Sequence, residues 1–306
     1  MKTFLLITFL FMSEWVVNGQ DFIISFKGTG SSTTVEKVIV ENLTQGKSIT
    51  LLGFQTLHLV SVASEQQTWQ YNTGDRLRFQ GTSGKFSTIV MDVPTQSKTI
   101  SFHFIECTDR DGNNYPVVQI GDQIWMAKNL AYLPKVSPPS EGSYTEPYYY
   151  VYGYSGEDVN EAKAIVNYHT YGVLYNWSAA LNACPNGWHL PTDDEWKQLE
   201  MAIGMSQNEV DEVGWRGINE GLKLRTTNGW GGKGNGSDDF GFSGLPSGRR
   251  RIYGAFDNFE YSSSWWCSNE KDNNLAWYRY LGYHYPFIYR YISRKEVGHS
   301  IRCIKD

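Results

Sequence analysis

Short runs of alternating apolar and polar residues fill the first third of the chain. Val, Ile, Thr and Phe are frequent in these runs, and Gly or Ser/Thr clusters such as Gly28–Ser32 and Gly81–Gly84 separate them. Such alternation at even spacing is typical of the strands of a small antiparallel β-sandwich. We therefore predict a β-sandwich domain over residues 20–106, with strands at Phe22–Lys27, Thr34–Val40, Ser48–Leu52, Thr56–Val60, Arg76–Gln80, Ser87–Val93 and Lys98–Ile105.

The pattern changes near residue 106, so residues 107–306 are predicted to form a second domain. This domain opens with two strand-like runs, Tyr115–Ile120 and Gln123–Met126. A stretch rich in Pro, Ser, Gly and Tyr follows over Pro134–Gly156, and its composition predicts a long surface loop.

Two helices are predicted next. Apolar residues at helical spacing predict the first over Tyr171–Ala183. The second begins at Thr192, whose hydroxyl can accept a hydrogen bond from the helix while Glu195 reaches back, an arrangement called a capping box. Beyond Gly221 the pattern returns to glycine-rich loops and short strands. A small all-β sandwich followed by this mixed α/β domain corresponds to an α+β fold class.

The first 19 residues have the pattern of a secretory signal peptide. Lys2 supplies the charged end, an apolar run covers Phe4–Met12, and the small residues Val17 and Gly19 suit cleavage after Gly19. We therefore expect a secreted or cell-surface protein, periplasmic or extracellular, in which disulfides can form. No run approaches the roughly 20 apolar residues that a membrane-spanning helix needs, so no membrane span is predicted.

Composition narrows the choice of partners. The 27 basic and 32 acidic side chains give a net charge of −5, which argues against a nucleic-acid partner because such partners need a basic face. Aromatic residues reach 15%, and 19 of the 20 Tyr and nine of the 11 Trp lie from Cys107 onward. The distinctive chemistry of the second domain is therefore that of rings and hydroxyl groups.

Aromatic side chains crowd the segment from Tyr261 to Tyr291, with arginines between them. Within Trp277–Leu281 and Tyr289–Tyr291, alternation puts Tyr on one strand face and Arg or Trp on the other. Rings with polar tips suit a surface that binds a glycan or an extracellular protein, but they can equally fill a core short of aliphatic residues. The candidate ligand-binding residues are Trp265, Trp266, Trp277, Tyr278, Tyr280, Tyr283, Tyr285 and Arg290.

Other chemistry is sparse. Asn235, Asp238 and Asp239 are weak candidates for calcium ligands, the alternative being a turn whose side chains bond to its own backbone. The chain has no G-x-S-x-G segment, and we predict no cofactor and name no catalytic residue. A glycosidase-type carboxylate pair stays open, with candidates near the aromatic segment at Asp257, Glu260 and Glu270.

Five segments, in order, resemble the Fibrobacter succinogenes major paralogous domain, a family of exported bacterial proteins with a poorly defined function. They are Ile120–Leu130, Tyr171–Trp177, Cys184–Thr192 with Glu195 and Trp196, Asn235–Phe242 and Ser300–Asp306. The resemblance covers nearly all of residues 107–306. One departure is Cys267, where the family usually carries a small residue.

The same region is more distantly similar to C-type lectin-like domains. Those domains pair a cysteine late in a helix with one just before the C-terminus, and Cys184 and Cys303 occupy the corresponding positions. The resemblance therefore implies a Cys184–Cys303 disulfide and a lectin-like core. Cys107 and Cys267 are left to pair with each other or to remain free thiols.

Segment Gly187–Thr192 with Glu195 and Trp196 is also similar to formylglycine-generating enzymes, which share the lectin-like core. Those enzymes need a reactive cysteine pair, whereas Cys267 has no close partner in sequence.

We expect an exported, non-catalytic binding or adhesion protein of the cell envelope, whose ligand is a glycan or a surface protein. One alternative is an enzyme of formylglycine-generating or glycoside hydrolase type. Another is a display scaffold whose Pro134–Gly156 loop varies between copies. The pairing of the four cysteines separates the oxidase from the binding protein, because an oxidase of this type requires a reactive free thiol.

Overall fold

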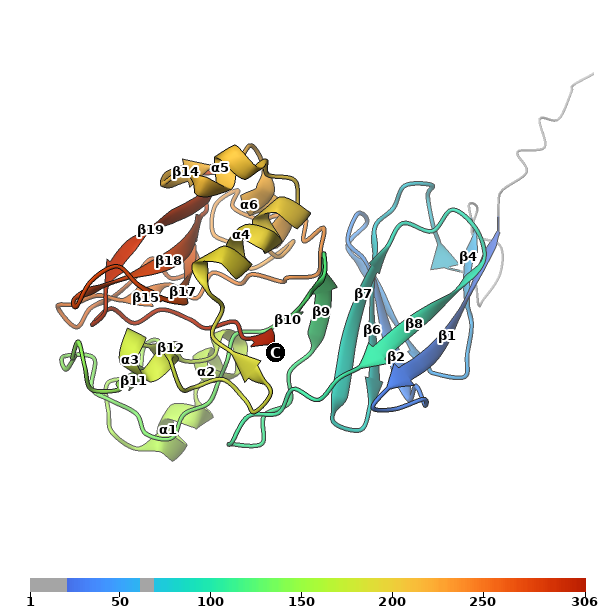
Figure 1. Cartoon of the computed structure of the whole chain (residues 1–306). Coiled ribbons are helices and arrows are strands. Elements are labelled where there is room, and N and C mark those ends of the chain that lie inside the picture. The colour runs from blue at the N-terminus through green and yellow to red at the C-terminus, as the bar shows by residue number, and fades with distance from the viewer. Residues whose placement is uncertain (1–20, 61–68) are drawn as a thin grey trace, which may run out of the picture.

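The computed structural model of the protein describes residues 21–60 and 69–306. The predicted signal peptide, residues 1–19, lies outside the described residues. Over these ranges the chain folds mainly into β-sheets, with short helices confined to the second half (Figure 1). None of the described helices combines the length and the apolar character needed to cross a membrane.

The first part of the chain contains all the strands that alternation predicts, with ends shifted by up to three residues, and one short strand, β5, that it does not predict. These strands are β1 (Phe22–Gly30), β2 (Lys37–Asn42), β3 (Lys47–Leu52), β4 (Leu57–Val60), β5 (Trp69–Gln70), β6 (Leu77–Ser83), β7 (Phe86–Asp92) and β8 (Lys98–Phe104).

Two sheets pack face to face in this part, one with the order β5-β4-β1-β8 and one containing β7-β6-β2-β3. Their inner faces bury apolar side chains such as Ile24, Phe79 and Phe102, all at 0% exposure. The predicted antiparallel arrangement is wrong for one sheet, because β1 pairs in parallel with β8, and β4 with β5. Parallel neighbours need crossover connections, and between β1 and β8 the chain crosses to the opposite sheet, where it forms β2, β3, β6 and β7.

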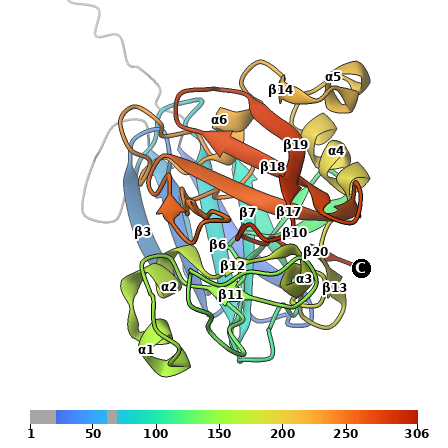
Figure 2. The same ribbon diagram turned by 90° about the vertical axis from the view of Figure 1, so that its left-hand side faces the viewer.

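The larger sheet continues beyond the sandwich. Thr88 and Ile89 of β7 pair in parallel with β9 (Val117–Ile120). Beyond β9 the sheet extends through β10 (Gln123–Met126), β20 (Ile304–Lys305) and β13 (Trp188–His189), so it has eight strands in all (Figure 2). Backbone hydrogen bonds, and not only side chains, therefore join the sandwich to the second half of the chain.

The second half is built around another sheet, of order β14-β19-β18-β17, with short helices over it (Figure 1). The helices are α1 (Val159–Ala164), α2 (Val166–Tyr171), α3 (Trp177–Ala180), α4 (Asp193–Ala202), α5 (Gln207–Asp211) and α6 (Glu220–Leu224). The remaining strands are β11 (Tyr149–Tyr150), β12 (Leu174–Tyr175), β14 (Gly214–Arg216), β15 (Arg249–Arg250), β16 (Phe256–Asp257), β17 (Ser262–Glu270), β18 (Leu275–Gly282) and β19 (Ile288–Arg294).

Helix α4 agrees with its prediction. The Thr192 hydroxyl accepts a hydrogen bond from the Glu195 backbone N–H, and the Glu195 carboxylate accepts one from the Thr192 N–H, which completes the capping box. The apolar stripe faces inward, with Trp196 and Leu199 buried.

The predicted helix over Tyr171–Ala183 is wrong, because the chain is broken there. Helix α2 ends before Gly172, whose φ of 76° lies in the left-handed region that favours glycine. The chain then forms β12 and starts again as the short α3, where Asn176 caps the helix by accepting from the Ala179 N–H. The apolar spacing alone could not reveal the turn at Gly172.

The Pro134–Gly156 stretch is mostly irregular and solvent-accessible, as its composition predicts, but part of it is buried. Its strand β11 pairs with β12, and Tyr150 and Val151 are fully buried. The Asn176 side-chain amide donates to the carbonyls of Ser143 and Glu146, at 2.8 and 2.7 Å. These contacts anchor the middle of the stretch to the core.

The disulfide implied by the lectin-like resemblance is present. Cys184, just after α3, joins Cys303, just before β20, with a Cα–Cα distance of 5.9 Å. The remaining cysteines, Cys107 and Cys267, are both buried and unpaired. The bond links the loop that follows α3 to the segment that leads into β20 of the large sheet.

Replacing both Cys184 and Cys303 by Ser is expected to lower the free energy of unfolding by about 3–5 kcal/mol, because the bond closes a long loop. Urea denaturation with and without reductant measures the change. Reductant should bring the wild-type midpoint to that of the double variant and leave the double variant unmoved. Equal stability of the oxidised and reduced wild type would contradict the prediction.

Candidate ligand-binding site

The sheet β14-β19-β18-β17 has two chemically different faces, as the sequence alternation predicts. Across β18 and β19, Tyr280 pairs with Tyr289, and Arg279 pairs with Arg290. Directly paired residues of neighbouring strands point to the same side of a sheet. One face therefore carries tyrosines and the other carries arginines.

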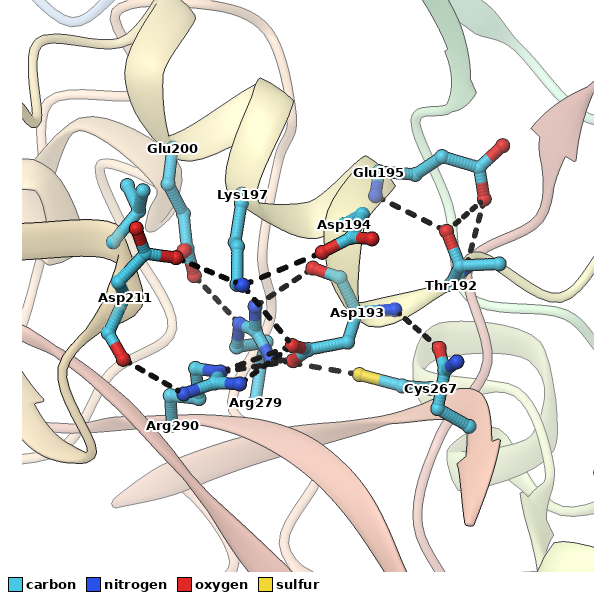
Figure 3. Close-up of polar contacts among 12 residues, drawn as sticks. Thr192, Asp193, Asp194, Glu195, Lys197, Glu200, Asp211, Cys267, Arg279 and Arg290 are labelled. Atoms are coloured by element: carbon cyan, nitrogen blue, oxygen red, sulfur yellow. Dashed lines mark hydrogen bonds and ion pairs between the residues drawn. The ribbon is translucent and has the colours of Figure 1, made fainter. Parts of the chain in front are cut away.

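The arginine face is buried beneath α4 (Figure 3). Asp193, in the first turn of α4, accepts hydrogen bonds from Arg279 at 2.7 Å and from Arg290 at 2.6 Å. Further along α4, the Glu200 carboxylate accepts hydrogen bonds from Arg279 at 2.6 Å and from Arg216 at 2.8 Å. We call these five residues the ion network.

Within the ion network, the arginines stabilise the charged form of Asp193. Burial by itself would raise the pKa of Asp193, but hydrogen bonds from Arg290 and the charge of Arg279 hold that pKa at about 2. Lys197 extends the network toward solvent, where it pairs with Asp194 at 3.3 Å. Arg290 therefore binds α4 to the sheet: its guanidinium already donates to Asp193, and the residue is only 7% exposed, which leaves it little surface for a ligand.

The two adjacent tryptophans of β17 are also core residues. Trp265 and Trp266 have 1% and 0% of their surface exposed. Their indole N–H groups donate to Asn129 Oδ1 at 3.0 Å and to the Tyr175 carbonyl at 2.8 Å. Trp277 is half-buried, with the Arg290 guanidinium 4.1 Å from its ring centre. The core-filling alternative thus applies to Trp265 and Trp266, which are buried with their indole N–H groups bonded, whereas Trp277 keeps part of its surface exposed.

The tyrosine face runs from the core to the surface. Tyr278, 7% exposed, stacks on the buried His299 ring with the centroids 4.8 Å apart. Tyr280 and Tyr289 are half-buried, and Tyr291, paired with Tyr278, is 43% exposed. His299 stays neutral at physiological pH, because its complete burial holds its pKa well below the ordinary value. The inner rings therefore form a rigid base for the outer ones.

A pocket of 280 Å³ opens where this face meets the hairpin of β15 and β16. Tyr253, at the tip of that hairpin, is 87% exposed. The residues that define the opening, here called the Tyr–Arg pocket, are Arg249, Arg251, Tyr253, Tyr278, Ser293 and Arg294.

The cations of the Tyr–Arg pocket are paired with carboxylates. Arg249 and Arg251 both contact Asp257, at 3.0 and 3.2 Å, and Arg294 contacts Glu296 at 2.9 Å. The pocket thus offers planar donors, carboxylate acceptors and ring faces with little unbalanced charge. This chemistry suits a neutral ligand that is rich in hydroxyl groups.

The other predicted aromatics lie at the opposite end of β18. Tyr285 is 46% exposed and packs on Trp215, with the ring centres 4.3 Å apart. Tyr283 packs against Tyr261 at 4.8 Å. The predicted set is therefore divided among the core, the tyrosine face and this second cluster.

The sequence prediction missed Arg249, Arg251, Tyr253 and Arg294, although the run of three arginines at 249–251 was a visible signal.

The calcium candidates each have a protein partner. Asn235 Oδ1 accepts from a backbone N–H of its own turn at 3.0 Å, and the buried Asp238 accepts from the N–H and hydroxyl of Ser243 at 2.7 and 2.8 Å. Asp239 forms an ion pair with Arg76 at 2.7 Å. The proposed ligation by these three residues is therefore corrected, and the turn interpretation accounts for Asn235 and Asp238. In the described ranges, no cluster of three or more His, Cys, Asp or Glu side chains could hold a metal ion.

Two of the three glycosidase candidates, Asp257 and Glu270, have carboxylates that already form ion pairs with basic side chains. Asp257 is held by Arg249 and Arg251, and Glu270 contacts Lys295 at 2.6 Å. Glu260 has a φ of 65°, in the left-handed region, which is typical of a residue in a tight turn.

The family model of the Fibrobacter succinogenes major domain matches residues 118–305. The chain belongs to this family. Searches of curated proteins and of solved structures gave no match. The matched range begins at β9, so the Fibrobacter succinogenes major domain contributes the second part of the shared sheet.

Three of the five segments that resemble the Fibrobacter succinogenes major domain meet at the buried Arg302 guanidinium. Arg302 donates to Asn129 Oδ1 at 2.8 Å and to the Phe242 carbonyl at 2.6 Å. These three residues come from three different segments. None of the residues that define the Tyr–Arg pocket belongs to these segments. The family segments therefore build the scaffold, and the pocket is formed by residues between them.

Replacing Asp193 by Asn is expected to lower the free energy of unfolding by about 3–5 kcal/mol, because two arginines lose their buried carboxylate. In the wild type, the contribution of Asp193 is present above its ordinary pKa of 3.8 and is lost as the pH falls toward 2. Asp193→Asn should flatten this acid limb in urea denaturation at a series of pH values. Asp194→Asn, at an 83% exposed side chain, is the matched control and should change little.

The two free thiols are expected to be inert in the native protein. Burial raises the pKa of Cys267 to about 12 and that of Cys107 further, so little thiolate forms at neutral pH. A thiol-counting reagent should detect no fast-reacting group before denaturation and both thiols after it. Rapid alkylation of either native cysteine would instead favour the formylglycine-generating type of activity.

Proposed function

We propose that this protein is an exported, non-catalytic binding protein of the cell envelope, whose ligand is a glycan held in the Tyr–Arg pocket. The observation that carries the proposal is the position of an exposed tyrosine ring beside arginines already paired with carboxylates. Tyr253 supplies an accessible ring face in the pocket lining, while Arg249 and Arg251 share Asp257. Sugars present both apolar faces and hydroxyl pairs, which such a surface can contact together.

The base of the pocket is rigid, which supports a binding role. Tyr278 is stacked on His299, and His299 contacts Ser264 at 2.6 Å and Ser293 at 3.0 Å through its two ring nitrogens. On the other side of the same sheet, the ion network binds the strands to α4. A preformed site loses less conformational entropy when its ligand binds.

We further propose that the family domain has a C-type lectin-like core. The Cys184–Cys303 bond and the position of Cys184 after a helix support this proposal. Export through the predicted signal peptide, residues 1–19, is part of the same proposal and agrees with the presence of a disulfide.

The test is binding of the mature chain to a panel of neutral and acidic oligosaccharides, followed by calorimetric titration of the best ligand. Tyr253→Ala and Arg251→Ala are expected to weaken binding by about tenfold each, since one removes an exposed ring and the other a paired donor. Tyr253 is exposed, so its truncation removes no core packing.

Tyr285→Ala is the matched control, because Tyr285 is an exposed tyrosine in the turn between β18 and β19, outside the Tyr–Arg pocket. Its binding should equal that of the wild type. Loss of binding in Tyr285→Ala alone would move the site to the Trp215 cluster. Failure of the wild type to bind any glycan, together with capture of a purified envelope protein, would replace the glycan by a protein ligand.

A further inference from the structure

A second pocket, of 440 Å³, lies where the sandwich meets the family domain. The sandwich contributes Glu41 of β2 and Arg78 of β6. The family domain contributes Lys128, just after β10, and the loop residues Thr227 and Asn228. Because β7 and β9 join both parts into one sheet, the walls of this junction pocket are held in a fixed relation.

Lys128 is the unusual member of the junction pocket. Its side chain is half-buried, and among the described residues it has neither a hydrogen-bond partner nor a carboxylate within ion-pair distance. Burial and the nearby charge of Arg302 both lower its pKa. A cation that has lost part of its water and has no counterion favours an anion from solution.

Other cations near the pocket are incompletely neutralised. Arg78 donates from Nη1 to Glu41 at 2.6 Å, while its buried Nε has no hydrogen-bond partner. Arg302 is fully buried, and its hydrogen bonds go to backbone carbonyls and to the neutral Asn129 side chain. The pocket lining also includes the carboxylates of Glu41 and Asp238; that of Asp238 is buried, and burial raises its pKa.

We infer that the junction pocket binds a small oxyanion, free or as the acidic group of a larger ligand, between Lys128 and Arg78. Thr227 and Asn228 also line the pocket, and a hydroxyl and a side-chain amide are groups that can donate to the oxygens of an anion. This site is separate from the Tyr–Arg pocket, because the two pockets have no lining residue in common. The inference therefore does not depend on glycan binding there.

An anion held here contacts both the sandwich and the family domain, so binding stabilises their junction. A ligand that binds only the native state raises the unfolding temperature in proportion to the logarithm of its concentration. The two parts are already connected across the same region by the Arg76–Asp239 ion pair at 2.7 Å.

The experiment titrates the mature chain with inorganic phosphate, sulfate, glucuronate and glucose at constant ionic strength, by calorimetry and by thermal unfolding. At least one of the three anions should bind and raise the unfolding temperature, whereas glucose, the neutral counterpart of glucuronate, should not. Binding of glucuronate alone indicates a sugar acid, and binding of phosphate or sulfate alone indicates an inorganic-type oxyanion.

Lys128→Met should weaken anion binding by about tenfold, because a charge-assisted hydrogen bond is lost. Lys271→Met, at an exposed lysine outside the pocket, makes the same change in net charge and should bind like the wild type. Lys128→Arg keeps the charge and should retain binding, which separates loss of the site from loss of the fold. The inference is overturned when no anion binds the wild type, or when Lys128→Met and Lys271→Met bind alike.

Discussion

Glu200 has no exposed surface, yet its carboxylate is bound by the guanidinium groups of Arg216 and Arg279. A buried charge of this kind is tolerated only when its partners are held in place, so α4 has one position over the sheet β14-β19-β18-β17. Because strands alternate, an arginine face directed at α4 requires the tyrosine face to lie on the other side. The ion network thus decides which face of the sheet can reach the surface.

In this member of the Fibrobacter succinogenes major domain family, the residues that hold the fold together differ from those that line the Tyr–Arg pocket. The residues around Arg302 join distant segments through hydrogen bonds that leave few polar groups free. The Tyr–Arg pocket is instead built from the β15–β16 hairpin and the end of β19, both outside those segments. Such an arrangement allows the ligand-facing residues to change while the buried hydrogen bonds stay in place.

The sandwich is more than an attached module, since its strand β7 continues directly into the family domain through β9. Ile89 of β7 also packs in the same core as Trp125 and Trp196. The junction pocket arises from this continuity, because its charged groups come from both sides of the β7–β9 pairing. Neither half of the chain has the complete set of side chains that lines it.

The sequence by itself determined the local structure: the strands of the sandwich, the capping box at Thr192 and the division of β18 and β19 into a tyrosine and an arginine face. These features depend on neighbours within a few residues, and the disulfide followed from a family resemblance. Only the tertiary structure decided that Trp265, Trp266 and Arg290 are internal and that Tyr253 is exposed. The exposure of a side chain depends on what covers it. Here the covering elements, α4 among them, come from distant parts of the chain, and their position is set by packing and buried charge.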